Sequence, residues 1–201
     1  MTIIGITGPS GVGKTSALRA LASLGAEVVD CDAVYHELLQ SDGALLQKLG
    51  KRFDGVVQSG CLNRRALGQI VFNDPAALCD LNDIAHAFVK DEVSRRLIQW
   101  EKAGASLTAI DAVALIESGM APLCTIVVGI TAPVEARIKR IMARDGITEA
   151  EALLRIRAQK PDSFYKKHCD YLLDSNGDTV EDFENTCRAF FSRLLGGADH
   201  A

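Results

Sequence analysis

A chain of 201 residues, 48% of them hydrophobic, is long and apolar enough for one domain with a buried core. This excludes a disordered chain and a disulfide-stapled miniprotein. The formal net charge of −4 argues against a general binder of nucleic acids or anionic membranes. The charge is uneven, however, because residues 137–167 carry nine basic and four acidic side chains, and a function must account for this basic stretch.

The cysteines and the N-terminal residues bear on the cellular compartment. None of the six cysteines forms a CxxC pair, so neither a zinc ribbon nor a thioredoxin-type site is supported, and reduced thiols are expected. The first apolar stretch, Ile3–Thr7, is too short for a signal sequence, and no apolar run approaches a membrane span. We therefore expect a cytoplasmic protein without a membrane partner.

Short apolar runs alternate with helical patterns in the first half of the chain. The patterns predict a strand at Ile3–Ile6, a helix at Lys14–Leu24, a strand at Glu27–Val29 that ends in Asp30-Cys31-Asp32, a helix from Ala33 to about Lys51, a helix capped by Asn63, and a helix from Asp74-Pro75 to about Lys102.

The second half of the chain continues this alternation. The predicted elements are a strand at Leu107–Ile110 followed by Asp111, a strand at Thr125–Val128, a helix opened by Pro133, a helix opened by the capping box Thr148–Glu151, a strand at Tyr171–Leu173, and a last helix that stops at Gly196. Five apolar strands alternating with helices predict an α/β fold with a parallel sheet.

One motif follows the first predicted strand: Gly8-Pro9-Ser10-Gly11-Val12-Gly13-Lys14-Thr15 matches GxxxxGK[ST]. Glycines let backbone N–H groups approach phosphate oxygens, and the helix N-terminus adds partial positive charge. The lysine reaches the β- and γ-phosphates, and the last hydroxyl ligates Mg²⁺. The sequence therefore predicts a site for ATP and Mg²⁺, with Thr15 as the metal ligand. The expected nucleotide-binding residues are Gly8, Ser10, Gly11, Val12, Gly13, Lys14, Thr15 and Ser16.

A phosphate-binding loop (P-loop) alone does not distinguish kinases from switch GTPases and motor ATPases. The chain has no NKxD motif, and its third predicted strand ends in Asp111-Ala112 rather than Asp-Glu. A small-molecule kinase needs a carboxylate near the loop, and Asp32 follows the second strand, at the edge where parallel strands place ligands. A carboxylate there accepts the proton of an acceptor hydroxyl. Asp30 is an alternative base or a simple turn residue.

The basic stretch supplies candidates for an arginine-bearing lid. Arg137, Arg140 and Arg144 are spaced three and four residues apart, so they share one helix face. The alternative is a solvated helix face, which is what most runs of charge are. The concentration of positive charge in an acidic protein favours a phosphate clamp, because a planar guanidinium meets two phosphoryl oxygens at once.

Further motifs extend along nearly the whole chain. They are the P-loop, Val28-Val29-Asp30-Cys31-Asp32, Gly60-Cys61-Leu62-Asn63-Arg64-Arg65, Ile84-Ala85-His86, Arg140-Ile141-Met142-Ala143-Arg144-Asp145, Gln159, and Cys169-Asp170-Tyr171-Leu172-Leu173-Asp174-Ser175-Asn176-Gly177. In this set the chain resembles the dephospho-CoA kinase family.

The resemblance implies a three-layer P-loop NTPase fold similar to that of nucleoside-monophosphate kinases. It implies transfer of the ATP γ-phosphoryl group to the ribose 3′-hydroxyl of dephospho-CoA, the last step of coenzyme A biosynthesis. It also implies three parts: a core of about 1–32, 105–135 and 168–201, a helical acceptor-binding segment of about 33–104, and a lid of about 136–167.

The resemblance also assigns roles to individual residues. Asp32 is implied as the base, and Lys14 and Arg140 as stabilisers of the transferred charge. The other implied ATP-binding residues are Arg144 and, near the adenine, Asn176 and Gly177. The implied substrate-binding residues are Asp32, Arg64, His86, Asp111 and Glu117. Only small-molecule partners are expected, with no nucleic acid, for a monomer or weak homo-oligomer.

The departures from the family pattern lie on the acceptor side. His86 is followed by Ala87 rather than proline, Asn63 replaces an aspartate, and residues 111–117 lack the usual proline and phenylalanine. The donor motifs are intact. Two alternatives therefore stay open: a related kinase for another nucleotide-like or small hydroxyl acceptor, and a nucleotide-dependent binding switch that has no acceptor.

Overall fold

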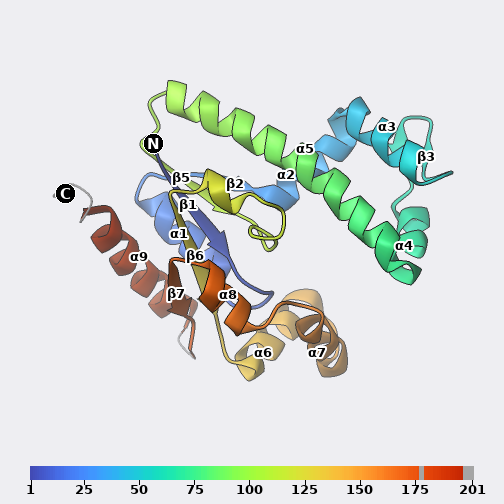
Figure 1. Cartoon of the computed structure of the whole chain (residues 1–201). Coiled ribbons are helices and arrows are strands. Elements are labelled where there is room, and N and C mark those ends of the chain that lie inside the picture. The colour runs from blue at the N-terminus through green and yellow to red at the C-terminus, as the bar shows by residue number, and fades with distance from the viewer. Residues whose placement is uncertain (177–178, 197–201) are drawn as a thin grey trace.

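A computed structural model describes residues 1–176 and 179–196. Five parallel strands form its central sheet in the order β2-β5-β1-β6-β7 (Figure 1). The strands are β1 (Thr2–Thr7), β2 (Glu27–Asp30), β5 (Leu107–Asp111), β6 (Ile126–Thr131) and β7 (Tyr171–Asp174). The predicted five-stranded parallel sheet and α/β class are thus confirmed.

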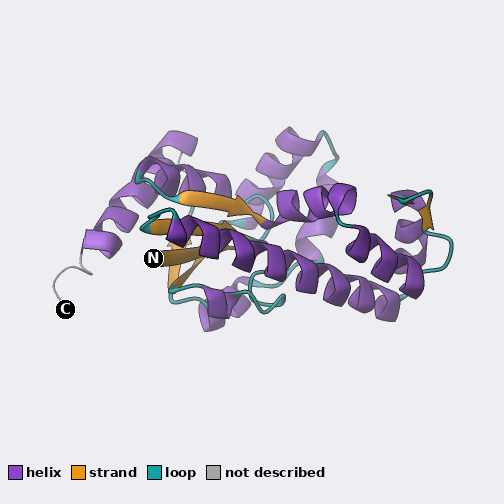
Figure 2. Ribbon diagram, turned by 90° about the horizontal axis from the view of Figure 1, so that it is seen from above, coloured by secondary structure: helices purple, strands orange, loops and turns teal. Residues whose placement is uncertain are grey.

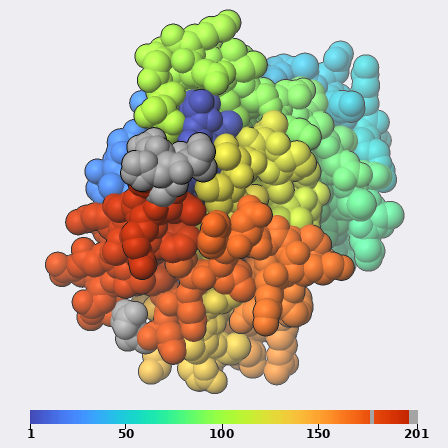
Figure 3. Space-filling view, turned by 60° about the vertical axis from the view of Figure 1, so that its left-hand side comes forward, coloured from blue at the N-terminus to red at the C-terminus, as the bar shows by residue number. Residues whose placement is uncertain are grey.

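Helices cover both faces of the sheet. On one face, α1 (Lys14–Ser23) and α9 (Val180–Gly196) pack together against Ile4 and Ile6 of β1. Side chains alternate along a strand, so Ile3 contacts a second core on the opposite face, beneath α5 (Pro75–Lys102). This gives the expected three layers. In the space-filling view, α9 and α8 (Asp162–His168) form much of one surface, with α5 above them (Figure 3).

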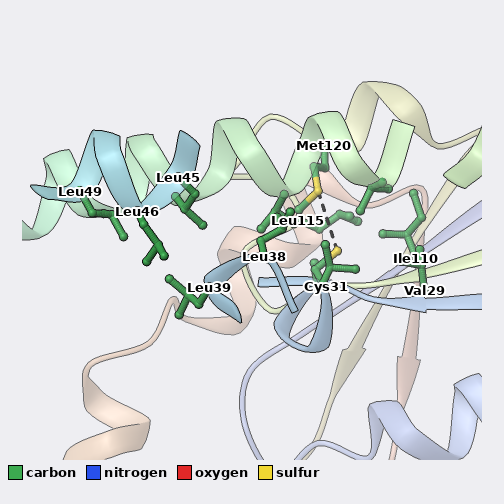
Figure 4. Close-up of a cluster of buried hydrophobic side chains, with 14 of the residues drawn as sticks. Val29, Cys31, Leu38, Leu39, Leu45, Leu46, Leu49, Ile110, Leu115 and Met120 are labelled. Atoms are coloured by element: carbon green, nitrogen blue, oxygen red, sulfur yellow. Dashed lines mark hydrogen bonds between the residues drawn. The ribbon is translucent and has the colours of Figure 1, made fainter. Parts of the chain in front are cut away.

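A helical arm, defined as residues 31–102, extends from the second core (Figure 2). It contains α2 (Cys31–Ser41), α3 (Gly43–Arg52), the hairpin β3 (Val57–Gln58) and β4 (Cys61–Leu62), α4 (Arg64–Asn73) and α5. Figure 4 shows a row of buried side chains from Leu49 on the arm to Ile110 in the sheet. The arm therefore shares one continuous core with the sheet.

The predicted helix from Ala33 to Lys51 is wrong, because two helices occupy this stretch. Asp42 adopts an extended conformation (φ −101°, ψ 99°), and its carboxylate accepts the N–H groups of Ala44 (2.8 Å) and Leu45 (3.1 Å). An aspartate before a glycine thus caps a new helix. The first helix also starts earlier than expected, at Cys31, so Asp32 lies in its first turn.

The basic segment, defined as residues 134–168, contains α6 (Val134–Asp145), α7 (Glu149–Arg157) and α8. Ile141, Ala152 and Ile156 form a small core of their own between α6 and α7. The predicted capping box is confirmed, because Thr148 and Glu151 bond to each other's backbone N–H groups. The hairpin, α8 and the 3-10 turn at Ala121–Leu123 were not predicted.

Within residues 1–176 and 179–196, no helix has the length and apolarity that crossing a membrane requires.

Candidate active site

The predicted P-loop joins β1 to α1 at the carboxyl edge of the sheet (Figure 1). Gly8 has φ +143°, and a Cβ at this position would lie 2.4 Å from the carbonyl oxygen of Ile130 in β6. Glycine is therefore required where the loop turns against the neighbouring strand. The loop borders a cavity of about 740 Å³.

This nucleotide cavity brings together most of the residues that the sequence predicted for ATP and catalysis. Its lining includes Ser10, Gly11, Val12, Gly13, Lys14, Thr15, Ser16, Asp32, Asp111, Arg140 and Arg144. The Val12 side chain is buried in the core, so only its backbone is available to a ligand. Among the other lining residues, Arg19, Thr179 and Phe183 were not predicted.

Lys14 folds back over the loop, where its Nζ donates a hydrogen bond to the Gly8 carbonyl (3.0 Å). Burial lowers the pKa of this ammonium, and the nearby Asp111 and Asp32 carboxylates oppose that shift. A lysine held by one neutral carbonyl exchanges that weak contact for phosphate oxygens at little cost. The side chain is therefore placed to bind the phosphates of a nucleotide.

Asp111 ends β5, where it is in register with Asp30 of β2 and Ile6 of β1. Its Oδ1 is buried without a hydrogen-bond partner among the described residues. Burial raises the pKa of Asp111 to about 6, although Lys14 acts in the opposite direction. Asp111 thus lies on the nucleotide side, although the resemblance assigned it to the substrate. A buried, unpartnered carboxylate oxygen beside a phosphate site fits a hydrated cation.

Asp30 and Asp32, the two candidate bases, have different surroundings. The Asp30 carboxylate caps α2 by accepting the N–H groups of Asp32 (2.8 Å) and Ala33 (3.1 Å). Asp32 is exposed and lines both the nucleotide cavity and a second cavity of about 220 Å³. Ala112 and Val113 line both as well, so Asp32 is the ionisable member of this shared wall.

The second cavity, here the acceptor cavity, includes His86 and Tyr35. Burial lowers the pKa of His86, while Asp83 and Glu117 oppose the shift. Cys31 lines it too, and its sulfur lies 3.9 Å from that of Met120, which anchors the first turn of α2 in the core (Figure 4). A third cavity of about 180 Å³ is lined by Arg64. Tyr35 lines both this third cavity and the acceptor cavity.

Three of the predicted residues that the structure describes line none of these three cavities, namely Gly8, Glu117 and Asn176. Glu117 is exposed in the loop after β5, and in the part of the chain that the structure describes it contributes to none of the three linings. Asn176 is exposed after β7, while Gly177 lies outside the described residues. Their expected roles at the acceptor and the adenine stay predictions.

The arginines of α6 reach the P-loop, although the Arg144 side chain stays largely exposed. The Arg140 guanidinium donates to the carbonyls of Gly11 (3.2 Å) and Ser175 (3.4 Å). Arg144 donates to the Ser10 hydroxyl (3.1 Å) and is held from behind by two hydrogen bonds to Asp145. The clamp interpretation of this helix face thus agrees with its position.

The sequence singled out Arg137 and Gln159 without giving either a role of its own in the site, and it did not single out Tyr35. Arg137 was part of the predicted face but had no role of its own, and it is 4% exposed and bonded to the P-loop. Gln159 bonds to both Arg137 and Ser10. Tyr35 was detectable as the residue one turn after Asp32, because residues i and i+3 share a helix face.

Described residues contain no group of three or more His, Cys, Asp or Glu side chains that would hold a metal ion between them. Fold and site together define a P-loop kinase for a small molecule, since Asp32 separates a phosphate cavity from a second cavity and arginines cover the loop. The sequence model of dephospho-CoA kinase matches residues 2–181, so the chain belongs to the dephospho-CoA kinase family.

Individual relatives are similar to this chain over almost its full length. The chain is 32% identical over 199 residues to a dephospho-CoA kinase from Syntrophotalea carbinolica, covering 98% of this chain and 94% of that protein. It is 35% identical to one from Thermus thermophilus, over 98% and 93% of the two chains. The crystal structure of the Thermus thermophilus protein TT1252 superposes with a TM-score of 0.74 at 33% identity, covering 96% and 97%. Family membership confirms the resemblance and the kinase class, and it disfavours an acceptor-free switch.

Proposed function

We propose that this protein transfers the γ-phosphoryl group of ATP to the ribose 3′-hydroxyl of dephospho-CoA, giving coenzyme A and ADP. The observation that carries the proposal is the position of Asp32 in the wall between the nucleotide and acceptor cavities. A group that deprotonates an acceptor hydroxyl must reach both the hydroxyl and the phosphoryl donor. Family membership supplies the identity of the acceptor.

In the proposed reaction, Asp32 is the general base. Its carboxylate accepts the proton of the 3′-hydroxyl as the oxygen forms a bond to the γ-phosphorus, and the bond from that phosphorus to the β-phosphate oxygen breaks. Asp30 is the weaker candidate, because its carboxylate already accepts two hydrogen bonds at the start of α2. Capping by Asp30 fixes the first helical turn and hence the backbone of Asp32.

Positive charge for the transferred group comes from three side chains. Lys14 leaves the Gly8 carbonyl to bind phosphate oxygens, and Arg140 and Arg144 reach the same region from α6. We propose that the basic segment works as the lid, closing these arginines over the phosphates. Closure excludes water and so favours transfer to the acceptor over hydrolysis.

The residues beside the loop also fit Mg²⁺. The Thr15 hydroxyl would bind it, and the unpartnered Oδ1 of Asp111 would accept a hydrogen bond from its hydration shell. When bound with ATP, the ion supplies charge that neutralises the β- and γ-phosphate oxygens.

The helical arm supplies the acceptor surface. His86 and Tyr35 border the space next to Asp32, and Arg64 stands beyond Tyr35 among the apolar side chains of Leu67 and Val71. An exposed guanidinium at a cavity with apolar lining residues suits an acceptor that carries a diphosphate and an uncharged tail. The arm is therefore proposed as the part that selects dephospho-CoA.

An ADP-release assay with purified protein, saturating ATP and Mg²⁺ tests the proposal directly. Turnover is expected with dephospho-CoA, and none is expected with nucleoside monophosphates or small alcohols. The altered acceptor-side motifs favour one competing function, a kinase for a different hydroxyl acceptor. Turnover of another compound in that panel without turnover of dephospho-CoA would establish this alternative.

The proposed reaction involves only small molecules as partners. We expect full activity from the purified chain, without nucleic acid or membranes, as a monomer or weak homo-oligomer in the cytoplasm. Light scattering during turnover checks the oligomeric state, and added nucleic acid or vesicles should leave the rate unchanged.

A further inference from the structure

Ser10 of the P-loop is held on all three of its polar groups by side chains from the basic segment. Its N–H donates to the Gln159 Oε1 (3.0 Å), and its carbonyl accepts from the Arg137 Nε (3.0 Å). Its hydroxyl accepts from Arg144 (3.1 Å). Arg137 also donates to the Gln159 Oε1 (2.9 Å), which closes a ring of hydrogen bonds through Ser10, Arg137 and Gln159. We call this ring the Ser10 clamp.

The buried guanidinium of Arg137 is an unusual choice for stability alone. Its side chain is 4% exposed, and burial lowers its pKa. Within residues 1–176 and 179–196, no carboxylate lies within ion-pair distance of it. A buried charge that bonds to a carbonyl and an amide costs more than an apolar side chain of the same size. This cost points to a role at the loop itself.

The clamp fixes the orientation of one peptide group. A trans peptide is planar, so directing the Ser10 carbonyl toward Arg137 directs the N–H of Gly11 the opposite way. Gly11 has φ +81° and lines the nucleotide cavity. Its N–H donates to no acceptor in the described parts of the chain. A backbone donor is therefore held free and in a fixed direction beside the phosphate site.

The clamp is itself positioned by packing. Gln159 follows α7, and its N–H bonds to the carbonyl of Ile156, which belongs to the small core of the basic segment. On the other side, α6 lies directly against Gly11, where a Cβ would be 3.0 Å from the Arg137 carbonyl oxygen. The first turn of α6 and the residue that follows the end of α7 thus both contact the loop, and the small core joins these two helices.

We propose that Arg137 and Gln159 are positioning residues for phosphoryl transfer, which hold the Ser10–Gly11 peptide so that the Gly11 N–H faces the transferred phosphoryl group. The inference rests on the proposed function of the site. A preorganised donor acts most strongly on the charge that develops in the transition state. Loss of the clamp should therefore lower kcat while leaving the KM for ATP nearly unchanged.

Three variants test this proposal in the ADP-release assay. Gln159→Leu removes the acceptor for both Ser10 and Arg137, and kcat should fall about 10- to 100-fold with KM for ATP within about threefold. Gln159→Glu keeps an acceptor oxygen and should recover kcat to within about fivefold of wild type. Gln99→Leu, the same change at an exposed site on α5, should behave as wild type. Wild-type kcat in Gln159→Leu, or equal loss in the Leu and Glu variants, would overturn the proposal.

A second measurement does not depend on turnover. In ¹⁵N-labelled protein, the Gly11 amide proton should shift on addition of adenylyl imidodiphosphate with Mg²⁺, and the shift should be less than half as large in Gln159→Leu. Equal shifts in the two proteins would contradict the clamp. If Gln159→Leu fails to fold, Arg137→Lys serves instead, because lysine keeps the charge but loses the two-pronged contact. Absence of dephospho-CoA turnover in the wild type would refute the proposed function, while the amide measurement still decides the clamp.

Discussion

The nucleotide side and the acceptor side of the molecule are built by different means. Around the P-loop, backbone groups of the loop and side chains from α6 and from Gln159, which follows α7, meet in a dense hydrogen-bond network centred on Ser10 and Gly11. Along the arm, the lining of the acceptor cavities comes mainly from side chains on the faces of α2, α4 and α5. The predicted phosphate site thus depends on the shape of the backbone. The predicted acceptor site depends on individual side chains, each of which a single substitution can change without altering the backbone.

This difference explains where the family motifs are intact and where they depart. A loop whose glycines contact Ile130 and α6 tolerates few substitutions. On the arm, Ala87 and Asn63 replace the family's usual residues, yet α4 and α5 form at the expected places. The Asn63 side chain caps α4 by accepting the Ala66 N–H (3.0 Å), which an aspartate does equally well.

The largest expected effect concerns Asp32, the residue shared by both sides. Asp32→Asn should lower kcat about 100-fold or more, because the amide cannot accept the hydroxyl proton, while the Kd for ATP stays near the wild-type value. Steady-state kinetics and nucleotide titration measure the two quantities. Asp91→Asn, at an exposed position of α5, is the matched control. An unchanged kcat in Asp32→Asn would remove this carboxylate from the mechanism.

The next largest effect concerns the stability of the nucleotide side, through the buried Asp111 carboxyl. The pKa of Asp111 is about 6 in the folded protein against 3.8 as the ordinary value, because burial disfavours the charge. A raised pKa means that the carboxyl favours folding at low pH and that this contribution is lost as the pH rises through about 6. From pH 4.5 to 7.5 the wild type should lose roughly 2 kcal/mol of unfolding free energy relative to Asp111→Asn.

Urea denaturation of the two proteins at both pH values measures this difference. Comparing wild type with variant at each pH cancels the other titrating groups, which both proteins share. If the unfolding free energy depends on pH in the same way in both proteins, burial does not raise the pKa of Asp111. A steeper fall of the unfolding free energy with pH in the wild type would show that the charged Asp111 carboxylate beside the phosphate site destabilises the folded protein.

The acceptor side should respond in binding rather than in chemistry. Arg64→Ala should raise the KM for dephospho-CoA about tenfold, with kcat and the KM for ATP near wild type, because the contact is equal in ground and transition states. Arg65→Ala is the matched control, since Arg65 is its exposed neighbour on α4 and outside the described cavity linings. A fall in kcat without a change in KM would instead place Arg64 with the catalytic groups.

Local signals in the sequence were sufficient for the sheet, the P-loop and most helix starts. Each depends on residues that lie close together in the chain, such as an apolar run, Asp74-Pro75 or the capping box at Thr148. The break at Asp42 was missed because the leucine pattern continues through it, although Asp42-Gly43 was a detectable signal for a cap.

The site was predicted less completely because some of its contacts join distant residues. The bond between Ser10 and Gln159 links positions 149 apart, and no local pattern indicates it. The burial of Arg137 depends on how α6 packs on the P-loop, and arginine spacing alone does not distinguish a buried face from a solvated one. The sequence therefore predicted candidate groups for the chemistry, while the fold shows what holds them in place.

The smallest expected effect tests whether the arm is an independent source of acceptor binding. Asp42→Ala removes the cap that separates α3 from α2 and should cost about 1 kcal/mol of unfolding free energy. In a domain of this size the midpoint of thermal unfolding should fall by about 2–4 °C. Asp91→Ala, an exposed aspartate within α5, should leave the midpoint unchanged. Because the lost bonds lie on the arm and away from the P-loop, the Kd for ATP should not change, whereas weaker ATP binding would show that the two sides are mechanically coupled through α2.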